Sequence, residues 1–209
     1  MNECTEFLRI ALSKGRILEE TVELLEGSGI KCQQVKGNGR KLIYTDEKQG
    51  VSFILGKPMD IPTYVEYGAA DLGVVGKDVL METEGEYYEL LDLNIGYCKL
   101  VVAGEKDKTE RDYRTIASKY PKLTEKYFES MGRQTNIVKL NGSVELAPLT
   151  NLADSIVDLV SSGQTLRENN LVELEKITDI TTRLIANKGS YQLKQARIVS
   201  LVENMQGSI

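Results

Sequence analysis

Short apolar runs separated by polar turns recur along the whole chain. Residues 8–12, "LRIAL", form such a run, and a polar turn, "SKGR", follows at 13–16. Apolar residues at helical spacing then continue to Gly27 and Gly29, where glycines favour the end of a helix. A strand, a turn and a helix in this order are typical of the opening of an α/β domain.

The same pattern predicts further strands and helices. We expect strands in the apolar runs at residues 40–44, 50–55, 70–76, 93–104, 115–121, 135–140 and 171–177. Helices are expected from Pro62, over 123–132 and in the carboxyl-terminal tail, and residues 141–149 are expected to form a turn that leads into a short helix. The run at 93–104 is long enough to cross between two lobes, and the polar stretch at 105–114 suits a connector.

The segment "NLADSIVDLV" at residues 151–160 fits two kinds of element. Its apolar residues sit at helical spacing, but an Ala-Asp pair followed by an apolar run also occurs at residues 70–76. That similarity favours a strand and indicates two α/β lobes of similar construction. Because ligands of open α/β sheets bind beyond the carboxyl ends of the strands, we expect a ligand in a cleft between the lobes.

Composition limits the class of protein. The chain has 209 residues, and its apolar fraction of 41% and charged fraction of 27% are typical of a globular protein with one large or two small domains. A net charge of −5 disfavours a nucleic-acid binder, and no apolar run is long enough for a membrane helix. The amino terminus lacks a signal-peptide pattern. The cysteines Cys4, Cys32 and Cys98 suit neither disulfides nor zinc, so we expect a cytoplasmic protein.

The chain contains no histidine, which restricts the chemistry available to it. Catalytic triads that use histidine, histidine general bases and most zinc enzymes are thereby excluded. An active site would have to use carboxylates, lysine, arginine, hydroxyls, backbone amides or an oxygen-bound metal such as magnesium.

The stretch "DLVSSGQTL" at residues 158–166 has the chemistry of an anion site. Small residues let backbone amides approach a phosphate closely, and hydroxyl side chains add further donors. The acid at the strand end could accept hydrogen bonds from sugar hydroxyls, which suits a phosphorylated ribose. A plain polar loop is the alternative, and the short motif alone does not decide between them. The residues concerned are Asp158, Ser161, Ser162, Gly163, Gln164, Thr165 and Leu166.

Basic residues stand at the ends of several predicted strands. They are Lys14 and Arg16, which flank Gly15, then Arg40, Lys41, Lys57 and Lys77. Each alone fits a solvated basic turn. Several of them at strand ends in an acidic protein indicate a polyanionic ligand, because arginine holds phosphate oxygens with two donors and lysine acts as a point charge.

Four carboxylates lie near these loops. Glu145, Asp71, Asp78 and Asp154 could bind magnesium or ribose. For Asp71 and Asp154 we favour a structural role, in which each anchors the start of the apolar run that follows it. The sequence contains neither a P-loop nor a dinucleotide-binding fingerprint.

Several of these stretches together closely resemble the ATP phosphoribosyltransferase family, the first enzyme of histidine biosynthesis. They include "IALSKGRILEETVELLEGSGI", "KPMDIPTYVEYGAADLGVVGKDVL", "IVKLNGSVELAPL" and "LADSIVDLVSSGQTLRENNLVE". The resemblance runs from about Leu8 to Asn187. Residues 13–16 read Ser-Lys-Gly-Arg where many members have Pro-Lys-Gly-Arg, and the tail after Lys188 matches poorly.

The resemblance implies a fold of two α/β lobes similar to type II periplasmic solute-binding proteins, with the active site in the inter-lobe cleft. The first lobe would comprise residues 1–92 and 183–209, and the second lobe residues 93–182. The chain looks like the short form of the family, which has no C-terminal regulatory domain and works with a histidyl-tRNA-synthetase-like regulatory subunit. We therefore expect a homodimer within a hetero-octamer, with no nucleic acid or membrane partner.

The resemblance also implies the reaction, in which ATP and phosphoribosyl pyrophosphate give N1-(5-phosphoribosyl)-ATP and pyrophosphate, with Mg²⁺. Residues 158–166 match the family's phosphoribosyl pyrophosphate loop. Arg16 and Arg40 match arginines near the leaving pyrophosphate and ATP, which makes them the expected catalytic residues. Further substrate-binding residues are expected to be Lys14, Gly15, Lys57, Lys77 and Glu145. No residue is assigned as a direct metal ligand.

Two other classes share parts of this pattern. A solute-binding or ligand-sensing module could have the same two-lobed fold without catalysis, although the amino terminus lacks an export signal. Another phosphoribosyltransferase could use the same phosphate loop for a different base, although the long match at residues 57–78 argues against it. Pyrophosphate release on mixing both substrates separates the first class from an enzyme, and a panel of bases separates the second.

Overall fold

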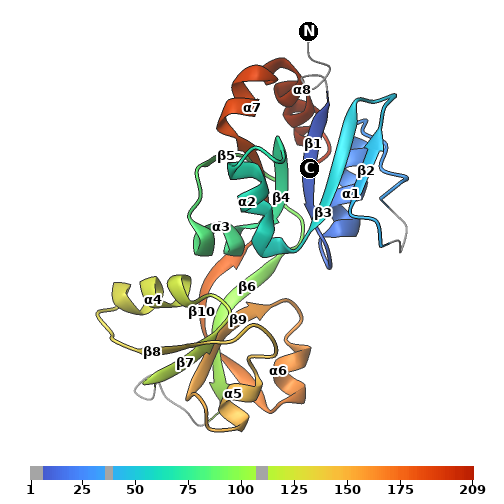
Figure 1. Ribbon diagram of the computed structural model, residues 1–209. Helices are drawn as coiled ribbons and strands as arrows, with labels where there is room; N and C mark the ends of the chain where they lie inside the picture. Colours follow the sequence, from blue (N-terminus) through green and yellow to red (C-terminus); the bar gives the residue numbers. More distant parts are fainter. Residues whose placement is uncertain (1–6, 36–39, 107–112) are drawn as a thin grey trace. The chain divides into compact units, whose positions relative to one another are not determined.

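Strand pairing divides the chain into two α/β units (Figure 1). The computed structural model describes residues 7–35, 40–106 and 113–209. The first unit comprises Met1–Gly96 and Thr181–Ile209, and the second unit comprises Tyr97–Ile180. Within the described ranges, no helix has the length and apolar character needed to cross a membrane. The two units, each with a sheet and helices, confirm the predicted α/β fold with two lobes.

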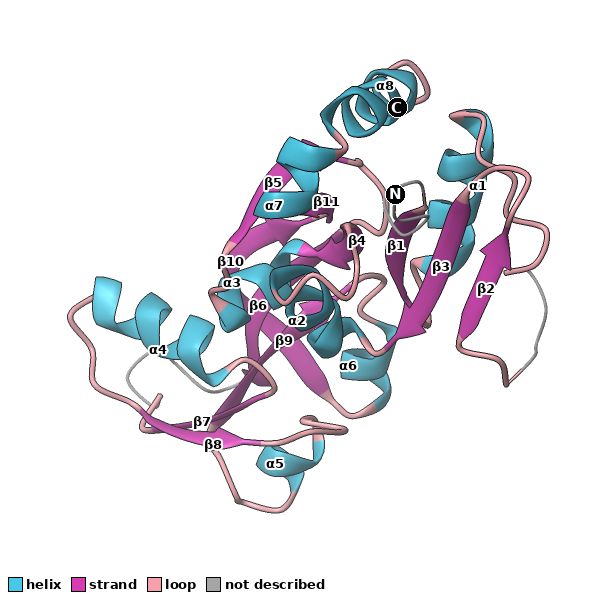
Figure 2. Cartoon of the chain, turned by 45° about the horizontal axis from the view of Figure 1, so that its top comes forward, coloured by secondary structure: helices cyan, strands magenta, loops and turns pink. Residues whose placement is uncertain are grey.

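The first unit is built on a six-stranded mixed sheet in the order β2-β3-β1-β4-β11-β5 (Figure 2). Its strands are β1 (Leu8–Ser13), β2 (Ile43–Asp46), β3 (Val51–Gly56), β4 (Leu72–Gly76), β5 (Tyr87–Asp92) and β11 (Thr182–Asn187). Strand β1 runs parallel to β3 and β4, whereas β2 is antiparallel to β3 and β11 is antiparallel to both β4 and β5. The carboxyl ends of β1, β3 and β4 therefore meet at one edge, which we call the first carboxyl edge.

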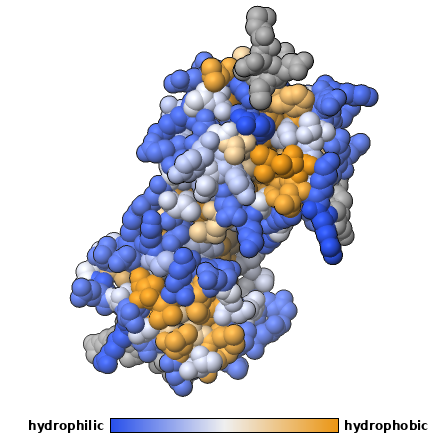
Figure 3. Space-filling view, viewed as in Figure 1, coloured by the Kyte–Doolittle hydropathy of each residue, from blue (hydrophilic) through white to orange (hydrophobic). Residues whose placement is uncertain are grey.

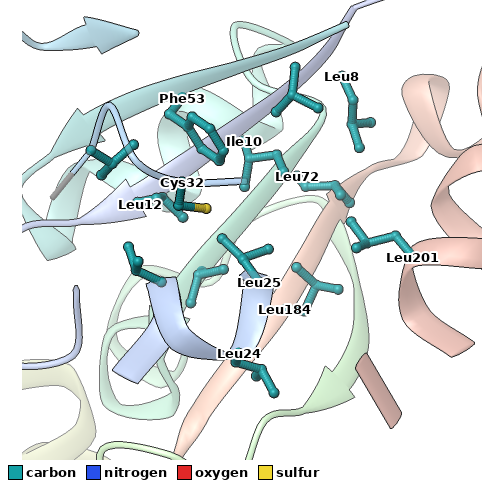
Figure 4. Close-up of a cluster of buried hydrophobic side chains, with 14 of the residues drawn as sticks. Leu8, Ile10, Leu12, Leu24, Leu25, Cys32, Phe53, Leu72, Leu184 and Leu201 are labelled. Carbon is teal, nitrogen blue, oxygen red and sulfur yellow. The ribbon is translucent and has the colours of Figure 1, made fainter. Parts of the chain in front are cut away.

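Helices cover both faces of this sheet. They are α1 (Leu18–Gly27), α2 (Ile61–Glu66), α3 (Lys77–Thr83), α7 (Lys188–Leu193) and α8 (Gln195–Gln206), with a 3₁₀ turn over Pro58–Asp60. Successive strand residues point to opposite faces, so β1 contributes Leu8, Ile10 and Leu12 to one core and Ala11 to the other. The first core includes α1 and α8 (Figure 4), and the second includes α2 and α3.

The second unit is built on a five-stranded sheet in the order β10-β6-β9-β7-β8. Its strands are β6 (Cys98–Glu105), β7 (Thr115–Ser118), β8 (Asn136–Lys139), β9 (Ser155–Val160) and β10 (Leu171–Ile180), and its helices are α4 (Pro121–Ser130), α5 (Leu146–Leu149) and α6 (Gln164–Glu168). Strand β7 is parallel to β8 and β9. Their ends form a second carboxyl edge, and α5 and α6 pack on one face of the sheet.

The structure corrects parts of the predicted element map. The strand expected over 93–104 begins only at Cys98, because Asn94 and Gly96 have φ angles of 51° and 64° that an extended strand does not allow. The predicted lobe boundary before Arg183 falls inside β11, whereas the structure keeps that strand whole because it pairs with two neighbours. The patterns did not predict β5, β11, α3 or α6. The strand preferred for residues 151–160 is confirmed as β9.

Two expectations concern the cysteines and the connector. Cys32 and Cys98 are buried thiols, in agreement with their expected use as small apolar side chains. Cys4 lies outside the described residues, as does most of the connector expected at residues 105–114.

The two units repeat one hydrogen-bonding arrangement at the start of a central strand. The backbone N–H of Asp71 donates to the carbonyl of Arg9 at 2.8 Å, and the N–H of Arg9 donates to the Asp71 carboxylate at 2.8 Å. In the second unit, Asp154 and Thr115 form the same reciprocal pair at 2.8 and 2.9 Å. The anchoring role predicted for both aspartates is therefore confirmed.

Asp71 makes further contacts that join distant parts of the first unit. Its side chain is 1% exposed and accepts from Arg9 Nη2 at 2.9 Å, Ser190 Oγ at 2.7 Å and Lys194 Nζ at 2.8 Å. Burial alone would raise the pKa of this carboxyl, but the hydrogen bonds from Arg9, Lys194 and Ser190 outweigh it and lower the pKa from 3.8 to about 2. Asp71 thus fixes the carboxyl-terminal helices to the starts of β1 and β4.

Replacing this carboxylate should destabilise the protein in a pH-dependent way. Asp71→Asn should lower the free energy of unfolding at pH 7 by about 3 kcal/mol, because Arg9 and Lys194 lose a buried counter-charge. Since the folded-state pKa lies below the unfolded value, the stabilisation is complete above about pH 4 and is lost as the pH falls towards about 2. Urea unfolding of variant and parent across this range should show the difference shrinking. The control Asp60→Asn, which removes an exposed carboxylate, should change stability by less than about 0.5 kcal/mol. A difference that stays constant with pH would contradict this account.

Candidate functional site

Five basic residues expected to bind anions lie at the first carboxyl edge. Lys14 follows the last residue of β1, Lys57 follows β3, and Lys77 follows β4 as the first residue of α3. Arg16 lies in the turn between β1 and α1. Arg40 precedes β2, whose starting end reaches the same edge because this strand is antiparallel to β3. The topology therefore collects positive charge that is spread over much of the sequence.

The turn after β1 has a fixed backbone and exposed side chains. The N–H of Lys14 donates to the carbonyl of Gly56 at 2.9 Å, which ties the turn to the end of β3. The carbonyl of Gly15 accepts from the N–H of Leu18 at 3.1 Å as the chain enters α1. Because the side chains of Lys14 and Arg16 are exposed, this turn presents two cations from a rigid base.

The side chains of Arg16 and Lys77 have different hydrogen-bond and ion-pair partners. Arg16 Nη2 donates to the carbonyl of Gly96 at 2.9 Å. Lys77 Nζ pairs with Glu89 at 2.6 Å, and the same carboxylate pairs with Arg183 Nε at 2.8 Å. A phosphate that contacts Lys77 would therefore compete with Glu89 for its charge.

The hydroxyl-rich segment lies at the second carboxyl edge, directly after β9. Residues 161–163 form a bend, and α6 begins at Gln164, so the predicted loop ends three residues earlier than expected. The hydroxyls of Ser161, Ser162 and Thr165 belong to exposed residues. Leu166, expected as a ligand residue, is 4% exposed and packs in the core because it lies on the inner side of α6.

The bend is shaped by Gly163 and closed by an arginine. Gly163 has φ of 71°, in the left-handed region where glycine carries no steric cost. Arg167 Nη1 donates to the carbonyl of Ser162 at 3.0 Å, and the N–H of Gln164 donates to the Ser162 hydroxyl at 3.3 Å. A positive charge therefore lies against a bend rich in hydroxyls, an arrangement that suits a bound anion.

Two carboxylates belong to the same edge of the second unit. By strand alternation, Asp158 shares a face of β9 with Ile156 and Val160, the face on which α5 and α6 pack. Glu145 lies in the connection from β8 to α5, immediately before that helix. Both are partly exposed, and a carboxylate accepts hydrogen bonds. This edge therefore has acceptors for ligand hydroxyls as well as the bend at residues 161–163.

The donor set does not form a metal cage made by protein alone. Among the residues that the structure describes, no three carboxylate or cysteine groups gather closely enough to hold a metal ion. Asp71 and Asp154 are bonded to strand backbone, and Asp78 is buried beside Gly76. Magnesium binds in many enzymes through one or two carboxylates and substrate phosphates, and Asp158 and Glu145 fit that arrangement.

Sequence reasoning missed two residues that support the site. Arg167 could have been found, because it lies four residues after Gly163, one helical turn along α6. Glu20 accepts the N–H of Gly96 at 3.0 Å across a separation of 76 residues. No sequence pattern indicates that contact, because it depends on the path of the chain after β5.

Comparison with known proteins finds relatives of one kind. A family model described as ATP phosphoribosyltransferase matches residues 57–207. An ATP phosphoribosyltransferase of Geobacter metallireducens is 50% identical over 208 residues, which cover 97% of this chain and 98% of the relative. One from Halalkalibacterium halodurans is 52% identical over 200 residues, covering 95% of this chain and 94% of the relative.

Solved structures show the same fold. The ATP phosphoribosyl transferase (HisG:HisZ) complex from Thermotoga maritima contains a chain with a TM-score of 0.83 and 34% identity, covering 96% of this chain and 98% of that one. The periplasmic VFT2 domain of Bordetella pertussis BvgS superposes with a TM-score of 0.64 at 14% identity, covering 99% of this chain and 89% of that one. The second likeness shows the fold alone, and it matches the predicted similarity to periplasmic binding proteins.

The conformation of Gly163 predicts a matched pair of variants. Gly163→Ala should lower the free energy of unfolding by about 1 kcal/mol, because alanine is strained at positive φ and its Cβ would lie 3.1 Å from Arg167 Nη1. Gly142→Ala, whose Cβ would meet nothing within 4 Å, should have an effect below about 0.5 kcal/mol. Urea unfolding compares the two, and equal effects would show that the bend does not depend on this glycine.

Proposed function

The chain belongs to the ATP phosphoribosyltransferase family, and on that premise we propose how its two carboxyl edges divide the substrates. The enzyme transfers the 5-phosphoribosyl group from phosphoribosyl pyrophosphate to N1 of ATP and releases pyrophosphate, the first step of histidine biosynthesis. One observation carries the division. The second edge brings hydroxyls and two carboxylates together with the cations Lys119 and Arg167, whereas the first edge has five cations.

In this proposal, the second edge holds the phosphoribosyl group. The backbone amides and hydroxyls of residues 161–165 surround the 5-phosphate, and Arg167 adds positive charge behind the bend. Asp158 and Glu145 accept hydrogen bonds from the ribose hydroxyls. Each assignment follows from chemistry, because phosphate needs donors and a sugar hydroxyl needs an acceptor.

The first edge receives the charge that the reaction creates. Adenine N1 has an available lone pair, so its attack on ribose C1 needs no strong base, which suits a chain without histidine. Negative charge grows on the pyrophosphate as its bond to C1 breaks. Arg16 and Arg40 meet this charge as the proposed catalytic residues, while Lys14, Lys57 and Lys77 hold the triphosphate or pyrophosphate. The turn at Gly15 places Lys14 and Arg16 together.

We also propose that the site takes Mg²⁺ together with the pyrophosphate of the substrate. Asp158 and Glu145, the carboxylates assigned to the ribose hydroxyls, would also be the protein groups that hold the ion. When bound, the ion neutralises phosphate charge. The arginines and lysines of the first edge then orient the pyrophosphate for departure.

The proposal includes a regulatory partner. The solved structure from Thermotoga maritima is a complex of two kinds of subunit, HisG and HisZ, which supports a second kind of subunit here. We propose, from the family resemblance, that this partner is histidyl-tRNA-synthetase-like and that the assembly is a homodimer within a hetero-octamer. Exposed leucines on and beside α5 lie on the surface of the second unit (Figure 3); they are Leu146, Leu149 and Leu152, 57%, 46% and 49% exposed. Exposed apolar surface of this kind favours contact within an assembly. The buried thiols fit a reducing cytoplasm.

The proposed catalytic arginines can be tested on the full chain with its assembly partners. Mixing ATP and phosphoribosyl pyrophosphate should release pyrophosphate and form phosphoribosyl-ATP, followed by its absorbance. Arg16→Ala and Arg40→Ala should each lower kcat on the order of 10²-fold, because a preorganised cation is lost from the leaving group. Lys48→Ala removes a cation from the turn between β2 and β3, at the opposite edge, and should change kcat less than about twofold. Loss of activity in all three variants would point to general electrostatics instead of these positions.

The division of substrates predicts a selective effect for Asp158. Asp158→Ala should raise the Kd for phosphoribosyl pyrophosphate by about tenfold or more and leave the Kd for ATP nearly unchanged, because the proposal places the ribose of the first ligand, and not that of ATP, against this acceptor. Calorimetric titration with each ligand separately measures both constants. Glu125→Ala, an exposed carboxylate on α4, is the control and should change neither. Equal weakening of both ligands would remove Asp158 from the phosphoribosyl site.

A further inference from the structure

Arg16, in the turn before α1, and Glu20, in the first turn of α1, both contact the backbone of Gly96. Glu20 Oε2 accepts the N–H of Gly96 at 3.0 Å, and Arg16 Nη2 donates to the carbonyl of Gly96 at 2.9 Å. Arg16 lies two residues before α1 and Glu20 lies in its first turn, so the turn that leads into the helix brings both side chains to Gly96. A single residue of the segment after β5 is therefore hydrogen-bonded to a cation just before α1 and to an anion within it.

Gly96 is suited to this position by its conformation and surroundings. Its φ of 64° is in the left-handed region, and the residue is buried. A Cβ added there would lie 2.6 Å from Ile17 Cγ2 and 2.9 Å from Thr182 Oγ1, so no larger residue fits without movement. A buried backbone N–H needs an acceptor, and Glu20 supplies it.

The consequence falls on the guanidinium of Arg16. A guanidinium has five N–H donors in one plane, so a bond from Nη2 to a fixed carbonyl restricts the orientation of the whole group. The N–H of Gly96 belongs to the Ile95–Gly96 peptide and its carbonyl to the next peptide. Two contacts hold the first of these peptides, because Glu20 accepts the N–H at 3.0 Å and the N–H of Thr182 donates to the carbonyl of Ile95 at 3.1 Å. Glu20 therefore contributes, through the backbone of Gly96, to the position of the carbonyl that accepts from Arg16.

We propose that Glu20 is a positioning residue for Arg16. The inference rests on the proposed role of Arg16 at the leaving pyrophosphate. Glu20 acts through the backbone of Gly96: it holds the N–H, the carbonyl keeps its place, and the carbonyl orients the guanidinium. Preorganised charge stabilises a transition state more than charge that must first be ordered, so loss of Glu20 lowers the rate of the chemical step.

Two substitutions of Glu20 separate its acceptor from its charge. Glu20→Ala should lower kcat about tenfold and change the KM of either substrate less than about twofold, because the misplaced group acts mainly in the transition state. Glu20→Gln keeps a side-chain oxygen that can accept the Gly96 N–H, and its kcat should stay within about threefold of the parent. Glu19→Ala removes a neighbouring exposed carboxylate of the same helix turn and should have the parent kcat.

A double-mutant cycle tests whether Glu20 acts through Arg16. In an Arg16→Ala background, Glu20→Ala should change kcat less than about twofold, because the group it positions is gone. Assays use the full chain in its native assembly, and urea unfolding checks that each variant is folded. If Glu20→Ala does not fold, Glu20→Asp, which shortens the acceptor, takes its place with the same expected loss.

The outcomes separate this inference from the proposed function. An unchanged kcat in Arg16→Ala would overturn the catalytic role of Arg16 itself. A large loss in Arg16→Ala together with a full further loss from Glu20→Ala would leave that role intact and overturn the positioning role. Equal losses in Glu20→Gln and Glu20→Ala would also overturn it, because charge instead of the acceptor would then matter.

Discussion

The buried carboxylate of Asp71 is the interaction on which the first unit depends. It bonds to Arg9 at the start of β1 and to Ser190 and Lys194 beyond β11. The chain leaves this unit after Gly96 and returns at Thr181, so the returning segment needs a strong and directional contact to fix it. A desolvated charge with several donors provides one, because any other register would leave the charge without partners. The alignment of β4 and β11, and with it the first carboxyl edge, follows from that contact.

The second unit uses a simpler version of the same construction. In this unit Asp154 and Thr115 form the reciprocal pair of hydrogen bonds. Each unit also has a buried serine at the end of a strand that donates to a carbonyl of the neighbouring strand. Ser13 of β1 donates to Val74 of β4 at 2.9 Å, and Ser118 of β7 donates to Val157 of β9 at 2.8 Å. Both sheets are thereby fixed near the two ends of their central strand pair. The loops beyond the carboxyl ends then differ in chemistry, with five cations in the first unit and a group of hydroxyls, carboxylates and Arg167 in the second.

Charge placement carries the reaction in a protein without histidine. The nucleophile needs no base, so binding and stabilisation of the leaving group are the terms left for the protein to supply. Arg16 illustrates how the fold supplies them. Its backbone turn is joined to β3 through Lys14, and its guanidinium is joined to Gly96, which Glu20 holds in turn. A flexible exposed side chain becomes a fixed charge through contacts with segments far away in the sequence.

The sequence by itself determined the fold class, the family and the residues at the strand ends. Apolar runs such as 8–12 and 155–160 are local patterns that predict strands directly. The motifs around Lys14, Lys77 and Asp158 are continuous in the sequence, so they can be identified without knowing the fold. Only the tertiary structure decided the rest. The segments of β5 and β11 mix polar and apolar residues without a clear strand pattern. They form strands because β11 pairs with both β4 and β5. Leu166 turned inward because α6 begins at Gln164, and the contact of Glu20 with Gly96 spans 76 residues. The spacing of apolar residues shows which side of a helix or strand is buried. Which strands pair, and which distant side chains meet, depends on the course of the chain between the elements, and no local pattern encodes that course.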